Sequence, residues 1–294
     1  MNSYRLVVTA RVGKAIFIRW FLQWPAATGP LLLRLGLFGA TVFSIVTHVA
    51  PSFWDRFHAS SVAASTAQTY CAPFGGHKSV QLEDASTVEL NSGTCITADI
   101  SSKARAIGLD AGEAIFQVAH DPTRPFVVKS GPISIEALGT QFDVYRRDAS
   151  TRVAVVEGVV QVGSLDATSR SSGKPLAELQ QIEVPDNPAL ARVRKNITPR
   201  EFDQMTAWIH GAIVLKQQSL KGAFSEFARY QHIQVEYKDP HIAEVPFDGN
   251  FRTTDLDSFL KLLNHRCIHS EYDKVSQRIT LTTVAGKRAG TQCS

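Results

Sequence analysis

Three side chains near the C-terminus have the spacing of a metal site. His265, Cys267 and His269 stand at i, i+2 and i+4. On a strand they would face one side, and imidazole and thiolate groups are common zinc ligands. However, His265 fits the end of a helix, and no fourth ligand is evident. The sequence therefore favours a buried Cys267 with surface histidines around it, and we predict neither a bound metal nor another cofactor.

Catalytic chemistry has no comparable signal. The chain contains no GxSxG, HExxH or Walker A sequence and no paired CxxC motif. Glu113, Asp143 and Glu157 lie on separate predicted strands beside turn-forming residues, so no two of them form an evident acid–base pair. We therefore predict that the protein is not an enzyme.

The four cysteines stand at positions 71, 95, 267 and 293. An even number of cysteines is compatible with disulfide bonding wherever the compartment is oxidising. Cys71 and Cys95 both fall at strand edges of the first predicted domain, so they form the favoured pair.

The strongest pattern of secondary structure is the β-rich stretch 131–163. Ile133 and Ile135 alternate with polar residues, and after the break at Gly139 the alternation resumes with Phe142 and Val144. Similar short runs separated by turn residues occur at 80–82, 88–90, 96–100, 104–109, 114–118 and 126–129, and 176–184 adds the last strand. We expect ten or more short strands in an all-β domain over 70–186, arranged as a meander, a solenoid or a sandwich.

The periodicity changes beyond a polar, proline-punctuated linker at 187–199. Ser219 can cap a helix with apolar residues at helical spacing, and Thr254 or Asp255 can cap a second helix. Trp208, Phe224 and Tyr230 are interpreted as core residues. The predicted order over 200–284 is β-α-β, β-α-β-β, a small α+β domain with its helices on one sheet face, followed by a tail at 285–294.

The N-terminal part has the pattern of a membrane anchor. Residues 31–50 form an apolar run of 20 residues, which as a helix is about 30 Å long, the thickness of a bilayer core. Residues 1–54 carry five basic and no acidic side chains, whereas the remainder is nearly neutral, with 26 basic and 27 acidic. This asymmetry predicts a cytoplasmic segment at 1–30, one transmembrane helix at 31–50 and an exported body. A stalk at 51–69 would connect the two. A cleaved signal peptide is the rival interpretation.

Several motifs together resemble one family. ALGTQFDV (137–144) followed by VVEGVVQV (155–162) is similar to the signature of FecR-type regulators of extracytoplasmic-function sigma factors. VQLEDASTVELNS (80–92), LDAGEAIFQV (109–118) and RPFVV (124–128) occur upstream in that family's order, with Ala85 where its members usually have glycine. The segment from about Trp208 to Leu281 follows the family's C-terminal pattern, which resembles the STN modules of secretins and TonB-dependent transducers.

The resemblance implies which residues matter. A leucine-rich helix in this region is implicated in contact with the transducer in the family, which gives Leu256, Phe259, Leu260 and Leu263 a partner-binding role beside their role in the core. The motif positions, to which the resemblance assigns a structural role, are Gly112, Glu113, Pro125, Phe126, Gly139, Thr140, Phe142, Val144, Glu157, Gly158, Trp208, Tyr230 and Gly249.

The resemblance also implies a function. The implied protein is an anti-sigma type regulator that crosses the inner membrane once. It would relay the state of an outer-membrane TonB-dependent transducer to an extracytoplasmic-function sigma factor and so control iron or siderophore uptake. Family members usually hold the sigma factor with several dozen cytoplasmic residues, whereas only about 30 precede the predicted anchor here. Either the start is abbreviated or this member has lost sigma binding. The alternative is an anchored periplasmic module that binds envelope components or glycans. The near-neutral body gives no basic patch that would indicate nucleic-acid binding.

Overall fold

The computed structural model describes residues 67–165, 175–284 and 289–290, which belong to one compact unit. None of the helices within these residues has the length and apolar character that a membrane crossing requires. The predicted cytoplasmic segment (1–30), the transmembrane helix (31–50), most of the stalk (51–69) and most of the tail (285–294) lie outside the described residues.

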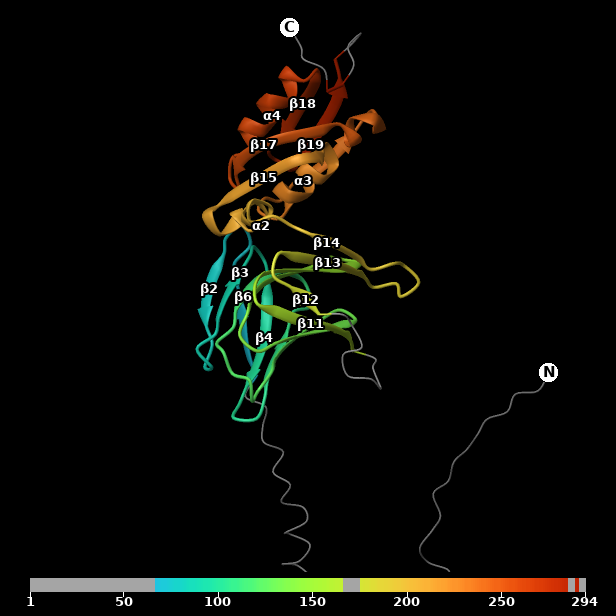
Figure 1. Cartoon of the computed structure of the whole chain (residues 1–294). Coiled ribbons are helices and arrows are strands. Elements are labelled where there is room, and N and C mark those ends of the chain that lie inside the picture. Colours follow the sequence, from blue (N-terminus) through green and yellow to red (C-terminus); the bar gives the residue numbers. More distant parts are fainter. Residues whose placement is uncertain (1–66, 166–174, 285–288, 291–294) are drawn as a thin grey trace, which may run out of the picture. The chain divides into compact units, whose positions relative to one another are not determined.

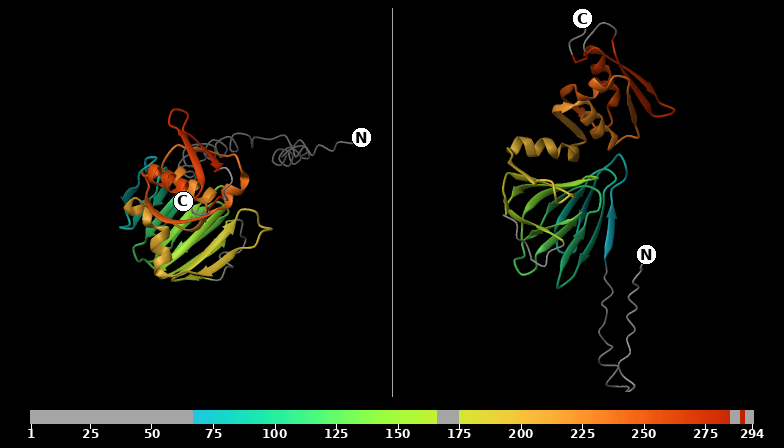
Figure 2. Two further views of the ribbon diagram at one scale, coloured as in Figure 1. Left: turned by 90° about the horizontal axis from the view of Figure 1, so that it is seen from above. Right: turned by 90° about the vertical axis from the view of Figure 1, so that its right-hand side faces the viewer.

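Two sheets of seven strands each form a β-sandwich (Figures 1 and 2). The first sheet has the order β1 (Gln68–Cys71), β4 (Cys95–Ile100), β5 (Arg105–Gly108), β7 (Phe126–Ser130), β8 (Ile133–Ala137), β11 (Val159–Ser164), β12 (Leu176–Ala177). The second has the order β14 (Val193–Asn196), β13 (Gln180–Pro185), β10 (Ser150–Glu157), β9 (Gln141–Arg146), β6 (Gly112–Gln117), β3 (Thr87–Leu90), β2 (Lys78–Gln81). Neighbouring strands are antiparallel except for β5 and β7.

The core of the sandwich comes from the alternation seen in the sequence. Ile133, Ile135, Phe142 and Val144 are all buried in one apolar cluster, where the ring of Phe142 stacks on that of Phe116. Side chains from both sheets fill this layer, as in face-to-face sheet packing. The prediction of an all-β domain is confirmed, and of the three arrangements considered the structure adopts the sandwich.

The end of the sandwich differs from the prediction. Residues 176–184 are not one strand: Leu179, at a φ of 55°, turns the chain between β12 and β13, which belong to different sheets. The segment 187–199, predicted as a linker, contains β14, which pairs with β13 as an edge strand. Its sequence, VRKN, lacks apolar alternation because both of its faces are largely exposed.

From residue 212 on, the strands and the two longer helices of the C-terminal module follow the predicted order, whereas the three short helices were not predicted. After α2 (Pro199–Met205) and the short helix η1 (Ala207–His210) come β15 (Ala212–Ser219), α3 (Leu220–Ala228), β16 (Gln234–Tyr237), η2 (Pro240–Glu244), β17 (Pro246–Arg252), α4 (Leu256–His265), β18 (Ile268–Asp273) and β19 (Arg278–Thr283). The strands form two sheets, β15–β17 and β16–β19–β18. The expectation of helices on one sheet face is wrong, because α4 packs against β17 of one sheet and β18 of the other.

Side-chain caps set the starts of the helices. The Ser219 hydroxyl accepts from the Gly222 amide at α3, and the Asp255 carboxylate accepts from the Ser258 amide at α4, as predicted. Thr198 and Glu201 form a reciprocal capping box at α2. Between the helices, the Phe259 ring contacts four other phenylalanine rings, which form the centre of the module's core.

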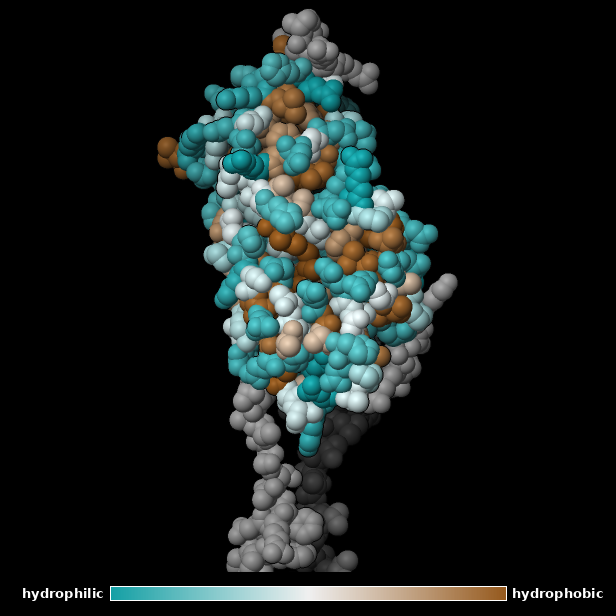
Figure 3. All heavy atoms as spheres, turned by 60° about the vertical axis from the view of Figure 1, so that its left-hand side comes forward, coloured by the Kyte–Doolittle hydropathy of each residue, from teal (hydrophilic) through white to brown (hydrophobic). Residues whose placement is uncertain are grey.

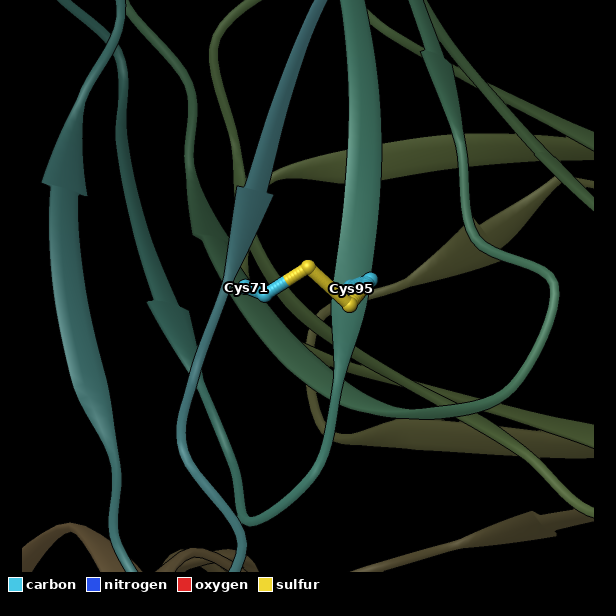
Figure 4. The surroundings of a disulfide bond; sticks show 2 residues. All are labelled: Cys71 and Cys95. Atoms are coloured by element: carbon cyan, nitrogen blue, oxygen red, sulfur yellow. A yellow bond between two sulfur atoms is a disulfide. The ribbon is translucent and has the colours of Figure 1, made fainter.

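The cysteine prediction is confirmed for one pair. Cys71 and Cys95 form a disulfide between β1 and β4, where they lie directly opposite each other (Figure 4). Cys71 and Cys95 are exposed, whereas Cys267 is buried. Cys267 is also disulfide-bonded. Within the described residues, no group of three or more His, Cys, Asp or Glu side chains could hold a metal ion.

Candidate functional site: the charged contact between the two modules

The outer face of the second sheet carries ionisable side chains in register. Glu113 on β6, Tyr145 on β9 and Arg152 on β10 lie opposite one another across three neighbouring strands. Asp143 lies two residues before Tyr145, on the same face of β9. A sheet face of this kind is usually solvated, yet Glu113 and Asp143 are both fully buried. The C-terminal module covers them.

Arg152 joins the two carboxylates. Its Nη2 donates to Glu113 Oε1 at 2.7 Å and to Asp143 Oδ2 at 3.1 Å. Burial of one charge is costly unless it is paired, so a guanidinium between two carboxylates lowers the cost for all three groups. The other oxygen of Asp143 has no hydrogen-bond partner within the described residues.

Arg229, at the C-terminal end of α3, brings the second positive charge from the other module. Its Nη2 donates to Glu113 Oε2, and its Nη1 donates to Glu226 Oε2 at 2.9 Å. Its guanidinium lies 4.4 Å from the centre of the Tyr145 ring, a cation–π contact. One arginine thus binds a carboxylate of its own module and a carboxylate and a ring of the sandwich.

Neutral groups complete the contact. Asn91 donates to Glu113 Oε2 at 2.8 Å and accepts from the hydroxyl of Tyr230 at 3.0 Å. The Ser92 hydroxyl donates to the main-chain carbonyl of Arg229. The Phe74 ring stacks on the His232 ring at 4.1 Å between centroids. We call the residues that form the hydrogen bonds, ion pairs and ring contacts described in these paragraphs the intermodule contact.

Burial and neighbouring charges shift the pKa values of Glu113 and Asp143 in opposite directions. Burial alone would raise the pKa of Glu113, but Arg229 and Arg152 outweigh it and hold that pKa below the usual range. Burial, together with the charge of Glu113, raises the pKa of Asp143 to about 7. With Asp143 protonated, the two arginines balance Glu113 and Glu226. The pKa of Tyr230 is raised to about 12 by burial, so its hydroxyl stays a donor to Asn91.

A cleft of 310 Å³ lies beside the ionic groups, between the sandwich, α2 and β15. Five consecutive residues of β15, Ala212–Lys216, line it together with Trp208 and Arg229. β15 pairs only with β17 within the described residues. The cleft therefore runs along a strand that could accept one more partner strand.

Comparison with known proteins identifies both modules. Residues 68–161 match the family model described as FecR protein, and residues 212–281 match the one described as FecR, C-terminal. The chain belongs to the FecR family. A search of curated proteins gives no significant match.

Solved structures share the fold of this FecR chain. Two crystal structures of a candidate anti-sigma factor from Parabacteroides distasonis ATCC 8503, at 1.65 and 2.50 Å resolution, superpose with TM-scores of 0.61 and 0.60. Each is 23% identical, and the alignment covers 74% of this chain and 99% of that one. At this identity the likeness shows a common fold.

The FecR motif positions have mostly structural roles. Phe126, Phe142 and Val144 are fully buried in the core of the sandwich, and Trp208 and Tyr230 are largely buried in the core of the C-terminal module. Glu157 and Pro125 are exposed beside turns. Of these motif positions, the structure brings only Glu113 and Tyr230 into the intermodule contact. Of the three acids considered from the sequence, Glu113 and Asp143 meet there through Arg152, whereas Glu157 is exposed elsewhere.

The glycines among the motif positions lie where a neighbouring residue is too close to leave room for a side chain. A Cβ on Gly112, where φ is +92°, would lie 2.3 Å from Thr94 Oγ1, and one on Gly139 would lie 2.5 Å from His120 Nδ1. A Cβ on Gly158 would collide with the side chain of Thr140, whose hydroxyl has no hydrogen-bond partner within the described residues. A Cβ on Gly249 would collide with the Phe251 ring.

The four residues predicted to bind a partner lie in the core. Leu256, Phe259, Leu260 and Leu263 are all buried on the inner side of α4. Direct contact of these side chains with a partner stays an untested prediction. The exposed side of α4, which includes Asp257, Ser258 and Lys261, is the part that a partner can reach in this structure.

Sequence reasoning missed Arg152 and Arg229. Arg152 stands in an otherwise apolar strand, TRVAVV, and Asp143 stands between Phe142 and Val144. A charge at such a position can mark a sheet face that another part of the protein covers. Arg229 carries no such signal, because it lies at the end of a helix where a basic residue is ordinary.

Proposed function

We propose that this FecR-family protein regulates an extracytoplasmic-function sigma factor, in the manner of an anti-sigma factor. The observation that carries the proposal is the presence of both family modules, in order, on one chain. The fold shared with a candidate anti-sigma factor supports it. The role is regulatory and needs no catalytic group of the chain.

In this proposal the chain spans the inner membrane once, through residues 31–50. The basic flank stays in the cytoplasm and the described body lies in the periplasm. The segment before the span would meet the sigma factor, and the body would receive the signal. The disulfide between Cys71 and Cys95 supports an oxidising compartment for the body.

The partner in the periplasm would be the signalling domain of a TonB-dependent transducer, which links the protein to iron or siderophore uptake. Two surfaces of the C-terminal module suit a folded partner: the strand edge of β15 and the exposed side of α4. On the face shown in Figure 3, hydrophobic residues are interspersed with hydrophilic ones, so we favour contact through backbone pairing or a mixed polar surface.

The test combines transcription and binding in the host bacterium. Deletion of the gene, complemented by the full-length chain, should change the output of a promoter that depends on the partner sigma factor. Full-length protein purified in detergent should retain that sigma factor and the transducer. Unchanged transcription together with saturable binding of envelope glycans would contradict the proposal and select the envelope-binding alternative.

A charge-reversal variant tests the surface of contact. Asp257→Lys/Lys261→Glu alters only the exposed side of α4, whereas Lys78→Glu in the edge strand β2 of the sandwich serves as the control. Loss of transducer binding in the first variant alone assigns the contact to the helix. Retention in both variants assigns it to a strand edge.

A further inference from the structure

The intermodule contact rests on two loops of the sandwich. Residues 72–76 provide Phe74, which stacks on His232, and Gly75, whose amide donates to Ser92 Oγ at 2.8 Å. Residues 91–94 provide Asn91 and Ser92, which bond Tyr230 and the carbonyl of Arg229. We call these two loops the platform.

The two loops of the platform are bonded to each other. The amide of Ala72 donates to the carbonyl of Thr94 at 2.9 Å, and the amide of Gly93 donates to the carbonyl of Pro73 at 3.3 Å. Thr94 Oγ1 also accepts from the amide of Glu113 at 3.0 Å, which places the start of β6. The geometry of the loops and the position of Glu113 are therefore linked.

The Cys71–Cys95 disulfide closes the base of this platform. Cys71 immediately precedes the first loop, and Cys95 immediately follows the second. β1 is an edge strand of four residues whose only strand partner within the described chain is β4 (Figure 4). The disulfide thus links β1 and β4 covalently at the point where the two loops leave these strands, and it holds the ends of both loops together.

Both cysteines are exposed, so a thiol can reach the bond. We propose that this disulfide is a redox-sensitive clamp on the attachment of the C-terminal module to the sandwich. A dithiol reductant would supply two electrons and two protons: the Cys71–Cys95 S–S bond breaks, each sulfur becomes a thiol, and the two sulfurs of the reductant form a new S–S bond. The loosened platform then holds residues 229–232 less firmly, while the cores of both modules stay folded.

The first test is hydrogen–deuterium exchange of the full-length chain. Because Cys267 is also disulfide-bonded, the clamp is removed by Cys71→Ser/Cys95→Ser rather than by a reductant. We expect several-fold faster exchange at 91–94 and 229–232, with unchanged exchange in β9, β10 and α4. The control, Thr69→Ala/Thr97→Ala, alters a neighbouring exposed cross-strand pair of β1 and β4 and should leave 229–232 as in the wild type.

Two results of this test overturn the proposal. One is wild-type exchange at 229–232 in the serine variant. The other is faster exchange throughout the sandwich and the C-terminal module, which would make the disulfide a general stabiliser of the fold.

A reciprocal test keeps both cysteines. If the disulfide favours the attached state, attachment must favour the disulfide to the same extent. His232→Ala removes the ring that stacks on Phe74 and lies in the other module. The Cys71–Cys95 bond of this variant should be reduced at lower concentrations of dithiothreitol than in the wild type, as measured by alkylation of Cys71. Equal reduction in the two chains contradicts the clamp.

Discussion

At the scale of single residues, Arg229 decides whether Glu113 can remain buried. Only 1% of the Glu113 side chain is exposed, and Arg229 and Arg152 neutralise it. Without Arg229, only Arg152 remains to neutralise the buried Glu113, and Glu226 also loses the guanidinium with which it pairs. Arg229→Gln should therefore lower the free energy of unfolding by about 3–5 kcal/mol, measured by urea denaturation.

Two further variants test that assignment. Lys238→Ala breaks the exposed pair with Glu236, in which 54% and 41% of the side chains are exposed, and should change stability by less than about 0.5 kcal/mol. Glu113→Gln combined with Arg229→Gln should cost less than the sum of the two single changes, because the two charges that pair with each other are then both removed. Additive costs would show that the two side chains do not interact.

Asp143 gives the contact a dependence on pH. Its pKa is raised to about 7 in the folded protein, against 3.8 as the ordinary value. The folded state therefore holds this proton more tightly, and the stabilisation is complete below pH 3.8 and is lost as the pH rises through 7. Glu113 acts in the opposite sense, since its lowered pKa favours folding above pH 4.5.

Asp143→Asn isolates this contribution, because an amide mimics the protonated acid in shape and keeps acceptor and donor groups. Between pH 5 and pH 8 the wild type should lose stability relative to the variant. Denaturant titrations at four pH values measure the difference. Parallel curves for the two chains would contradict the raised pKa.

At the scale of elements, one glycine fixes the start of β6, from which Glu113 projects. Gly112→Ala would place a Cβ 2.3 Å from Thr94 Oγ1 at a φ of +92°, so we expect a loss of about 1–3 kcal/mol in unfolding free energy. Gly108→Ala is the matched control, since the nearest atoms to its Cβ lie at 3.9 and 4.0 Å. That variant should range from neutral to about 1 kcal/mol more stable.

Helix α4 has a buried side, which includes Phe259, and an exposed side, which includes Lys261, so substitutions on the two sides should differ in their effect on stability. Phe259→Ala removes the ring at the centre of the phenylalanine cluster and should destabilise the module by about 3–5 kcal/mol in thermal or urea unfolding. Lys261→Ala, on the exposed side of the same helix, should change stability by less than about 0.5 kcal/mol. A small effect of Phe259→Ala would show that the core tolerates the cavity.

The elements also show what could be predicted from the sequence. Alternation predicted most strands of the sandwich, because each has a face in the apolar core, and the caps Ser219 and Asp255 marked the two larger helices. β14 has no apolar face, and the turn at Leu179 uses a non-glycine residue at positive φ. The site was missed for another reason: Glu113, Asp143, Arg152 and Arg229 meet only because distant segments fold together, and no local pattern encodes that meeting.

At the scale of the described molecule, the intermodule contact couples two cores. Ile115 of the sandwich is buried in the apolar cluster of the C-terminal module, next to the ionic groups on the same sheet face. A contact that combines apolar burial with paired charges should make the two modules unfold together. A rigid connection of this kind would let binding at one module affect the other, as the proposed relay of a signal requires.

Calorimetry of the full-length chain tests this coupling. The wild-type body should give one transition, with calorimetric and van't Hoff enthalpies in agreement. Asn91→Ala/Arg229→Gln removes the hydrogen bond between Tyr230 and Asn91 and the ion pair between Arg229 and Glu113, so two transitions should appear. Val275→Ser, at a hairpin tip where the residue is 95% exposed, should leave the single transition unchanged. Two transitions in the wild type would mean that the modules unfold independently, which would contradict the coupling inferred from the intermodule contact.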